Sequence, residues 1–184
     1  MTASPTPSRS RQSLIDALHN DHPARDRAER LGLYGFLVGS WDMDFVSHRD
    51  DGTRLAGSGE IHAGWVLEGR AIQDVWTIPP RAARRPDLPP GVNFYGTTLR
   101  IYDPGIDAWH ILWSDPVKQY YSRQIGRAHG RDIVQIGKDD SGAAVRWRFT
   151  EITPDTFHWL GERSPDDGAS WQLQIEFFAR RAAA

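Results

Sequence analysis

The feature that most constrains the fold of this 184-residue chain is a repeated alternation of apolar and polar residues with a period of two. Such an alternation places every second side chain on one face of an extended strand, so each segment is predicted to be a half-buried β-strand. The pattern starts at Trp41 and returns to the end of the chain, broken about every 8 to 15 residues by Asp-, Gly- and Pro-rich turns. No helical pattern separates these segments. We therefore expect an all-β fold, a single antiparallel up-and-down barrel of about eight to ten strands, which leaves no open sheet edge.

The clearest pair of predicted strands flanks the segment DPGID at residues 103–107, which is typical of a hairpin turn. A five-residue turn places Tyr102 opposite Ala108, whereas a four-residue turn would mix polar and apolar side chains on each face, so we expect the five-residue register. The inner face of this hairpin is then predicted to carry Tyr95, Leu99, Ile101, Trp109, Ile111 and Trp113. The outer face would carry Thr98, Arg100, Tyr102, His110 and Ser114.

The chain divides into three parts by composition. Residues 1–12 are rich in Ser, Thr, Pro and Arg and are predicted to be a disordered tail. Residues 13–33 are predicted to form a helical segment of two short pieces, which either close one end of the barrel or lie on its outside. Residues 34–181 form the predicted barrel domain, interrupted by a Pro- and Arg-rich loop at 79–93 whose length is typical of a lid or binding element.

Composition excludes several classes of function. A net charge of -2 argues against a nucleic-acid partner, and the absence of cysteine excludes disulfides and thiolate metal sites. No apolar run is long enough to span a membrane as a helix, and the N-terminus lacks the apolar core of a signal peptide. We expect a cytoplasmic protein with no membrane partner, and a homodimer stays open.

Eight tryptophans are a high count for this length. Trp76 is ambiguous, because the strand at 70–78 points either Ile72, Asp74 and Trp76 or Ala71, Gln73 and Val75 inward. The alternation places the other seven on the apolar faces of their strands: Trp41, Trp65, Trp109, Trp113, Trp147, Trp159 and Trp171. One interpretation is that they pack the core. The other is that they line a cavity, because a barrel of this size encloses side chains and one small ligand.

A few charged residues fall on the predicted inner face, where burial costs free energy unless a partner is present. These residues are Arg123, Glu151, Arg163 and one of Asp74 or Gln73. They form either internal ion pairs, Arg123 with Asp74 or Arg163 with Glu151, or a functional site. In a site, an arginine would orient a ligand carboxylate or enolate, and Asp74 or Glu151 would act as acid or base.

The first functional hypothesis is therefore a binding protein for a small apolar or aromatic molecule. Its predicted ligand-binding residues are Trp65, Trp76, Trp109, Trp113, Trp147 and Trp159, with Tyr121, Arg123 and Arg163 as polar contacts. The alternative is a cofactor-free enzyme, such as an isomerase, cyclase, hydratase or decarboxylase, that uses Asp74 or Glu151 as catalytic residues. We expect no metal site, because His62, His110 and His158 are scattered over the predicted outer face.

Several short motifs resemble those of a known superfamily. The stretch Val38-Gly39-Ser40-Trp41 resembles the Gly-x-Trp opening strand of calycins, which include lipocalins and fatty-acid-binding proteins. Further segments, in this order along residues 34–181, resemble an uncharacterised bacterial calycin-like family of unknown function: 64–70, 102–104 with 113–115, 167–171 and 179–181. The resemblance implies an antiparallel barrel and no particular activity. Haem-binding nitrobindin-like barrels are related, but this chain lacks their Gly-x-Trp-x-Gly-x-Gly opening, so we expect no haem and no other cofactor.

Overall fold

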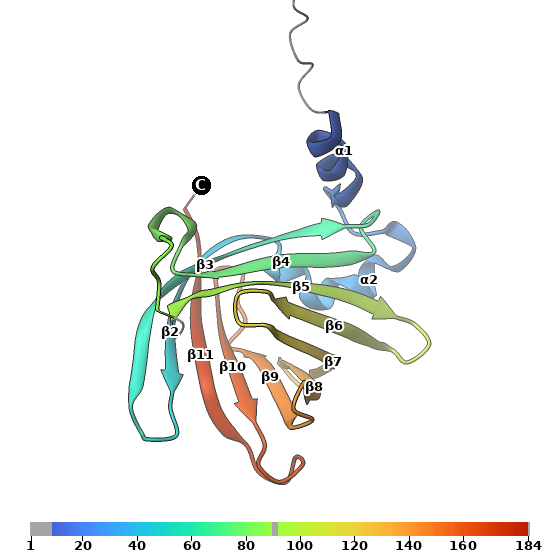
Figure 1. Ribbon diagram of the computed structural model, residues 1–184. Helices are drawn as coiled ribbons and strands as arrows, with labels where there is room; N and C mark the ends of the chain where they lie inside the picture. Colours follow the sequence, from blue (N-terminus) through green and yellow to red (C-terminus); the bar gives the residue numbers. More distant parts are fainter. Residues whose placement is uncertain (1–8, 90–91, 184) are drawn as a thin grey trace, which may run out of the picture.

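The computed structural model describes residues 9–89 and 92–183, and its main body is a closed antiparallel β-barrel (Figure 1). Each of the strands β2 to β10 pairs with the strand that follows it, and β11 pairs with β2 to close the sheet. This confirms the predicted all-β, up-and-down architecture with ten barrel strands. The strands are β2 (Gly39–His48), β3 (Arg54–Val66), β4 (Ala71–Ile78), β5 (Phe94–Asp103), β6 (Ala108–Asp115), β7 (Tyr120–His129), β8 (Asp132–Asp139), β9 (Ala144–Thr150), β10 (Thr156–Arg163) and β11 (Gln172–Arg181).

On half of the barrel the predicted faces are confirmed. Trp41, Met43 and Phe45 of β2 are buried in the interior while Asp42 and Asp44 are exposed. Strands β6, β9 and β10 likewise direct their predicted aromatic residues inward. On β4 the structure resolves the ambiguity: Asp74 and Trp76 point inward with Ile72. The aromatic core follows directly from the alternation in these strands.

On strand β5 the predicted face is wrong. Asp103 lies opposite Ala108, so the turn has four residues instead of five, with Asp107 in the left-handed region at φ 44°. The shift by one residue moves every side chain of β5 to the other face. Thr98 and Arg100 therefore point into the barrel beside Trp113 and Ile111, their partners across the strand pair.

On strand β7 the predicted inner and outer faces are also reversed. Ser122 and Gln124 are buried, whereas Tyr121 and Arg123 are exposed on the outer face. Hydrophobicity selects the wrong face on β5 and β7 because their inward positions include the polar residues Thr98, Arg100, Ser122 and Gln124. The outward apolar residues of β5 to β8 include Leu99, Ile101, Leu112, Ile125 and Ile136.

A β-bulge explains one further difference. Gly161 lies opposite Ile175 and Glu162 opposite Leu173, so Gln174 is an extra residue on β11. Residues of β11 that precede Gln174 therefore lie on the face opposite to the one that a regular alternation predicts. Trp171 therefore does not enter the barrel; its ring lies 4.4 Å from the Arg146 guanidinium on the outer side.

The N-terminal segment has one part outside the barrel and one part that enters it. Helix α1 (Arg9–Leu18) stands away from the barrel (Figure 1), followed by the short strand β1 (His19–Asn20), which pairs with β3. After η1 (Arg25–Arg27) and α2 (Ala28–Leu31), the segment η2 (Gly32–Leu37) enters one end of the barrel. Leu31, Tyr34 and Leu37 are completely buried there.

The predicted boundaries of this region are only partly met. The predicted tail at 1–12 lies mostly outside the described residues, and its last four residues belong to α1, which begins before Ser13. Helix α2 ends at Leu31 with Gly32 as its C-cap, and because Gly32 keeps helical φ and ψ the chain continues directly into η2. None of the helices in the described ranges is long and apolar enough to cross a membrane.

The two ends of the barrel differ. At the closed end η2 packs under the turn between β9 and β10, where Arg181 donates hydrogen bonds to the carbonyl oxygens of Phe36 and Pro154. The opposite end carries residues 79–89, which include η3 (Arg81–Ala83). Arg81 Nε lies 2.5 Å from Glu60 Oε1 on the outer face of β3, so the start of this loop lies against the outside of the barrel.

Candidate functional site

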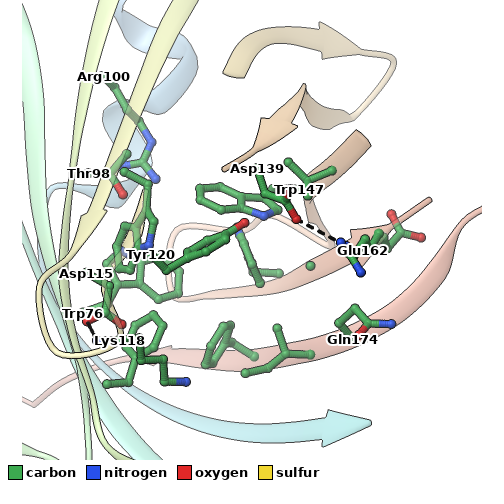
Figure 2. Close-up of a pocket in the computed structure, with 18 residues that line it drawn as sticks. Trp76, Thr98, Arg100, Asp115, Lys118, Tyr120, Asp139, Trp147, Glu162 and Gln174 are labelled. Carbon is green, nitrogen blue, oxygen red and sulfur yellow. Dashed lines mark hydrogen bonds and ion pairs between the residues drawn. The ribbon is translucent and has the colours of Figure 1, made fainter. Parts of the chain in front are cut away.

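The barrel contains a cavity of about 320 Å³ that opens at the end opposite η2 (Figure 2). This volume lies within the range of small-molecule binding sites. Four tryptophans from four strands form most of its wall: Trp76, Trp113, Trp147 and Trp159. Phe94 and Phe177 extend the aromatic surface, with the Phe94 ring stacked 5.2 Å from the Trp113 ring and the Phe177 ring 5.1 Å from that of Trp159.

Two glycines make this arrangement possible. A Cβ atom at Gly96 would collide with the Trp113 ring, and one at Gly161 would lie 2.7 Å from the Trp159 ring. The Trp113 ring therefore lies against Gly96 of the neighbouring strand β5, and the Trp159 ring lies against Gly161 of its own strand β10. The tryptophans line the wall and leave the centre of the barrel free.

The floor of the cavity is formed by Arg100, which is 1% exposed. Its Nη1 donates to the carboxylate of Asp74, which also accepts the backbone N–H of Thr98 at 3.1 Å. The guanidinium lies over the rings of Tyr34 and Phe149, at 5.4 and 5.7 Å from their centroids. Burial lowers the pKa of Arg100 to about 10, so it stays positively charged at neutral pH. Beneath it, Tyr34 and Trp109 fill the closed end.

At the mouth, two more carboxylates face two cations. Oδ1 of the buried Asp115 accepts the backbone N–H groups of Val117 and Lys118, which fixes the turn between β6 and β7. The Lys118 ammonium lies 5.2 Å from the centroid of the Phe94 ring. Burial lowers the pKa of Lys118, and the nearby Asp115 carboxylate partly offsets this effect.

The second pair joins β8 and β10. Asp139 Oδ2 lies 3.2 Å from Arg163 Nε. Partial burial by itself would raise the pKa of Asp139, but hydrogen bonds from Ser141 and Ala143 and the charge of Arg163 lower it. Between the two pairs lies Tyr120, whose pKa burial raises to about 12, so its hydroxyl stays protonated at neutral pH.

The structure brings together only part of the predicted site. Trp76, Trp113, Trp147, Trp159 and Arg163 line the cavity. Trp65 and Trp109 are buried as predicted, but they pack at the closed end, Trp65 against Gly35 and Trp109 edge-to-face with Tyr34.

Three predicted positions are wrong. Tyr121 is 42% exposed and Arg123 is exposed as well, because β7 presents the opposite face to the interior. Glu151 is exposed in the turn after β9 at the closed end, so it lies away from the cavity mouth. Neither predicted internal ion pair forms; the partner of Asp74 is Arg100, and that of Arg163 is Asp139.

Sequence reasoning missed Arg100, Thr98, Asp115, Lys118 and Tyr120 among the lining residues. For Arg100 and Thr98, a signal existed: the four-residue turn would have placed both on the face of Trp109 and Trp113. Asp115 is the last residue of β6 and lies on the same face as Trp109 and Trp113, so the alternation itself was the signal. Its position at the mouth depends on the turn that it caps.

The histidines lie on the outer face, as predicted. His158 Nε2 and His48 Nε2 each lie 2.9 Å from an oxygen of Glu176, and the His158 ring stacks on Phe178. Among the residues that the structure describes, no group of three or more His, Cys, Asp or Glu side chains is arranged to hold a metal ion.

No known family model matches the chain, and no curated protein sequence matches it significantly. Solved structures do match. Rv2717c from M. tuberculosis aligns with a TM-score of 0.61 and 13% identity over 85% of this chain and 99% of its own. The S-type phycobiliprotein lyase CPES from Guillardia theta aligns with a TM-score of 0.57 and 14% identity, over 88% and 99%. At this level of identity the similarity concerns the fold alone, and the chain has a calycin-like β-barrel fold.

Proposed function

We propose that this protein binds a small, largely apolar or aromatic molecule inside the barrel. The observation that supports the proposal is the cavity itself: about 320 Å³ of space walled by four tryptophans in a closed barrel. A barrel interior filled for stability alone would be packed to the density of other protein cores. Flat aromatic walls instead offer stacking surfaces to a flat ligand, and each such contact adds to the free energy gained by burying its apolar area.

The proposal is tested with the neutral fluorescent probe N-phenyl-1-naphthylamine. We expect saturable binding of one probe per chain and quenching of tryptophan fluorescence. The variant Val145→Phe adds a ring to a buried residue of the cavity wall and should weaken binding at least about tenfold, which corresponds to about 1.4 kcal/mol.

The matched control is Ile136→Phe, which places the same ring on the exposed outer face of the adjacent strand β8. It should leave the dissociation constant within about twofold. Binding that does not saturate, or a Val145→Phe variant that binds as well as the unmodified protein while folded, would contradict a cavity-bound ligand.

The acid–base alternative has less support. Glu151 is exposed at the closed end, and Asp74 is held by the Arg100 guanidinium and a backbone N–H beneath the cavity floor. One structural neighbour is a phycobiliprotein lyase, so a barrel of this fold also serves an enzyme. The residue arrangement here supports binding more directly than proton transfer.

We further propose that the chain belongs to the uncharacterised bacterial calycin-like family whose motifs it resembles. The barrel is the fold that such membership requires. The proposed partner is a small hydrophobic or aromatic molecule bound without a metal or haem cofactor. We retain a cytoplasmic location and a homodimer as proposals on the grounds of sequence alone.

A further inference from the structure

We propose that the ligand of the barrel is uncharged and carries both a hydrogen-bond acceptor and a hydrogen-bond donor on its aromatic body. This inference rests on the proposed binding function and adds the chemical class of the ligand. It depends on two independent properties of the cavity: the balance of its charges, and the polar atoms that no other side chain or backbone group satisfies.

The charges of the cavity are balanced pairwise. Arg100 is paired with Asp74, and Arg163 with Asp139. Lys118 lies in the field of Asp115. Glu162 also belongs to the wall, but its carboxylate is held on the outer face by Arg146 and Arg148 at 2.7 and 2.9 Å.

This pairing decides which ligands the cavity favours. A carboxylate or an ammonium ion would bring an additional charge into an apolar space in which each cation already faces a carboxylate. Such a charge loses its hydration without gaining a free counter-ion, and this desolvation disfavours its binding. A neutral ligand avoids that cost.

Polar atoms in the wall show that the ligand is not a pure hydrocarbon. Trp76, Arg100 and Asp115 are 4%, 1% and 0% exposed, and all three line the cavity. Within the described part of the chain, Trp76 Nε1, Arg100 Nε and Asp115 Oδ2 have no hydrogen-bond partner. A buried polar atom without a partner costs free energy. Because these three atoms belong to side chains of the cavity wall, we infer that groups of the ligand supply their partners.

The three atoms differ in chemistry. Trp76 Nε1 and Arg100 Nε are N–H donors and require an acceptor, such as a carbonyl or ether oxygen. Asp115 Oδ2 is an acceptor and requires an N–H or O–H donor. A molecule such as an aromatic amide or a hydroxylated aromatic ketone offers both groups without a net charge.

The experiment compares three naphthalene probes that share one ring system: 2-naphthamide, 2-naphthoate and 2-naphthylmethylammonium. Their dissociation constants are measured by calorimetry at pH 7, with N-phenyl-1-naphthylamine as the reference probe. We expect the amide to bind at least about tenfold more tightly than either ion. Equal binding, or tighter binding of an ion, would overturn the inference while the reference probe still reports a working cavity.

Two charge variants make the test sharper. Asp115→Asn keeps an oxygen for the turn but leaves Lys118 without its carboxylate, so the affinity for 2-naphthoate should rise at least about tenfold. Lys118→Met removes the opposite charge and should raise the affinity for the ammonium probe instead. Asp115→Asn should also bind 2-naphthamide more weakly, because the side-chain NH2 group that replaces Oδ2 cannot accept the N–H of the amide. An unchanged ion preference in both variants would contradict the charge balance.

The donor is tested by Trp76→Phe, which removes the indole N–H and keeps an aromatic ring. It should weaken 2-naphthamide about fivefold to tenfold more than it weakens naphthalene. Trp147→Phe shortens another ring of the same wall and should weaken both probes alike. A protein that binds none of the probes, the reference included, would overturn the proposed function together with this inference.

Discussion

At the scale of single residues, the buried pair Arg100–Asp74 is the most consequential feature. Both side chains are almost completely removed from solvent, and the guanidinium also packs over two aromatic rings. An ion pair in this position is sensitive to the loss of either partner, because the remaining charge is buried without compensation. The pair thus fixes the polarity of the cavity floor.

Replacing Asp74 by Asn should therefore lower the free energy of unfolding by about 3–5 kcal/mol, because it leaves the Arg100 charge buried. Urea denaturation at pH 7 measures this change. The control is Asp44→Asn, which breaks the exposed pair with Arg180 at 3.0 Å and should cost less than about 1 kcal/mol. Similar losses of unfolding free energy in both variants would show that the buried pair stabilises the protein no more than the exposed pair.

At the scale of elements, strands β9 and β10 are joined across their outer face by one carboxylate. Glu162 accepts hydrogen bonds from Arg146 and Arg148, which extend from two positions of β9. Burial by itself would raise the pKa of Glu162, but the hydrogen bonds and charges of the two arginines outweigh it and lower the pKa. The protonation of Glu162 therefore makes the interaction between β9 and β10 dependent on pH.

The sign of that dependence follows from the lowered pKa. A group whose pKa is lower in the folded protein stabilises it above the unfolded pKa, which for Glu is about 4.3, and loses this contribution as the pH falls through the folded value. Glu162→Gln should cost about 1.5–3 kcal/mol at pH 7 and flatten the loss of stability below about pH 4.3. Urea denaturation between about pH 3 and 7 tests this, with the exposed Glu68→Gln as a control that should leave the profile unchanged.

At the scale of the whole molecule, the barrel has one end filled by η2 and one end that opens to the cavity. Tyr34 and Leu37 close the first end and support the floor formed by Arg100, whereas α1 stands outside (Figure 1). The side chains of α1 from residue 12 onward are mostly exposed. The stability of the molecule therefore depends on η2 far more than on α1.

Leu37→Ala should lower the free energy of unfolding by about 2–5 kcal/mol, since it removes a fully buried side chain from a packed end. Deletion of residues 1–17 should change it by less than about 1 kcal/mol. Both are measured by urea denaturation against the full chain. A deletion as damaging as the Leu37 change would mean that α1 contributes to the barrel core.

The sequence by itself determined the barrel, because period-two alternation and regular turns leave few other ways to bury one face of so many strands. It also identified the inward tryptophans of β6, β9 and β10. Only the tertiary structure showed which polar side chains point into the barrel. Thr98 and Arg100 enter the barrel through a turn one residue shorter than the hydrophobic pattern favoured, and the buried Arg100 charge is compensated by Asp74 on the neighbouring strand β4. Such pairings join residues far apart in the chain, so local patterns of hydrophobicity contain no information about them.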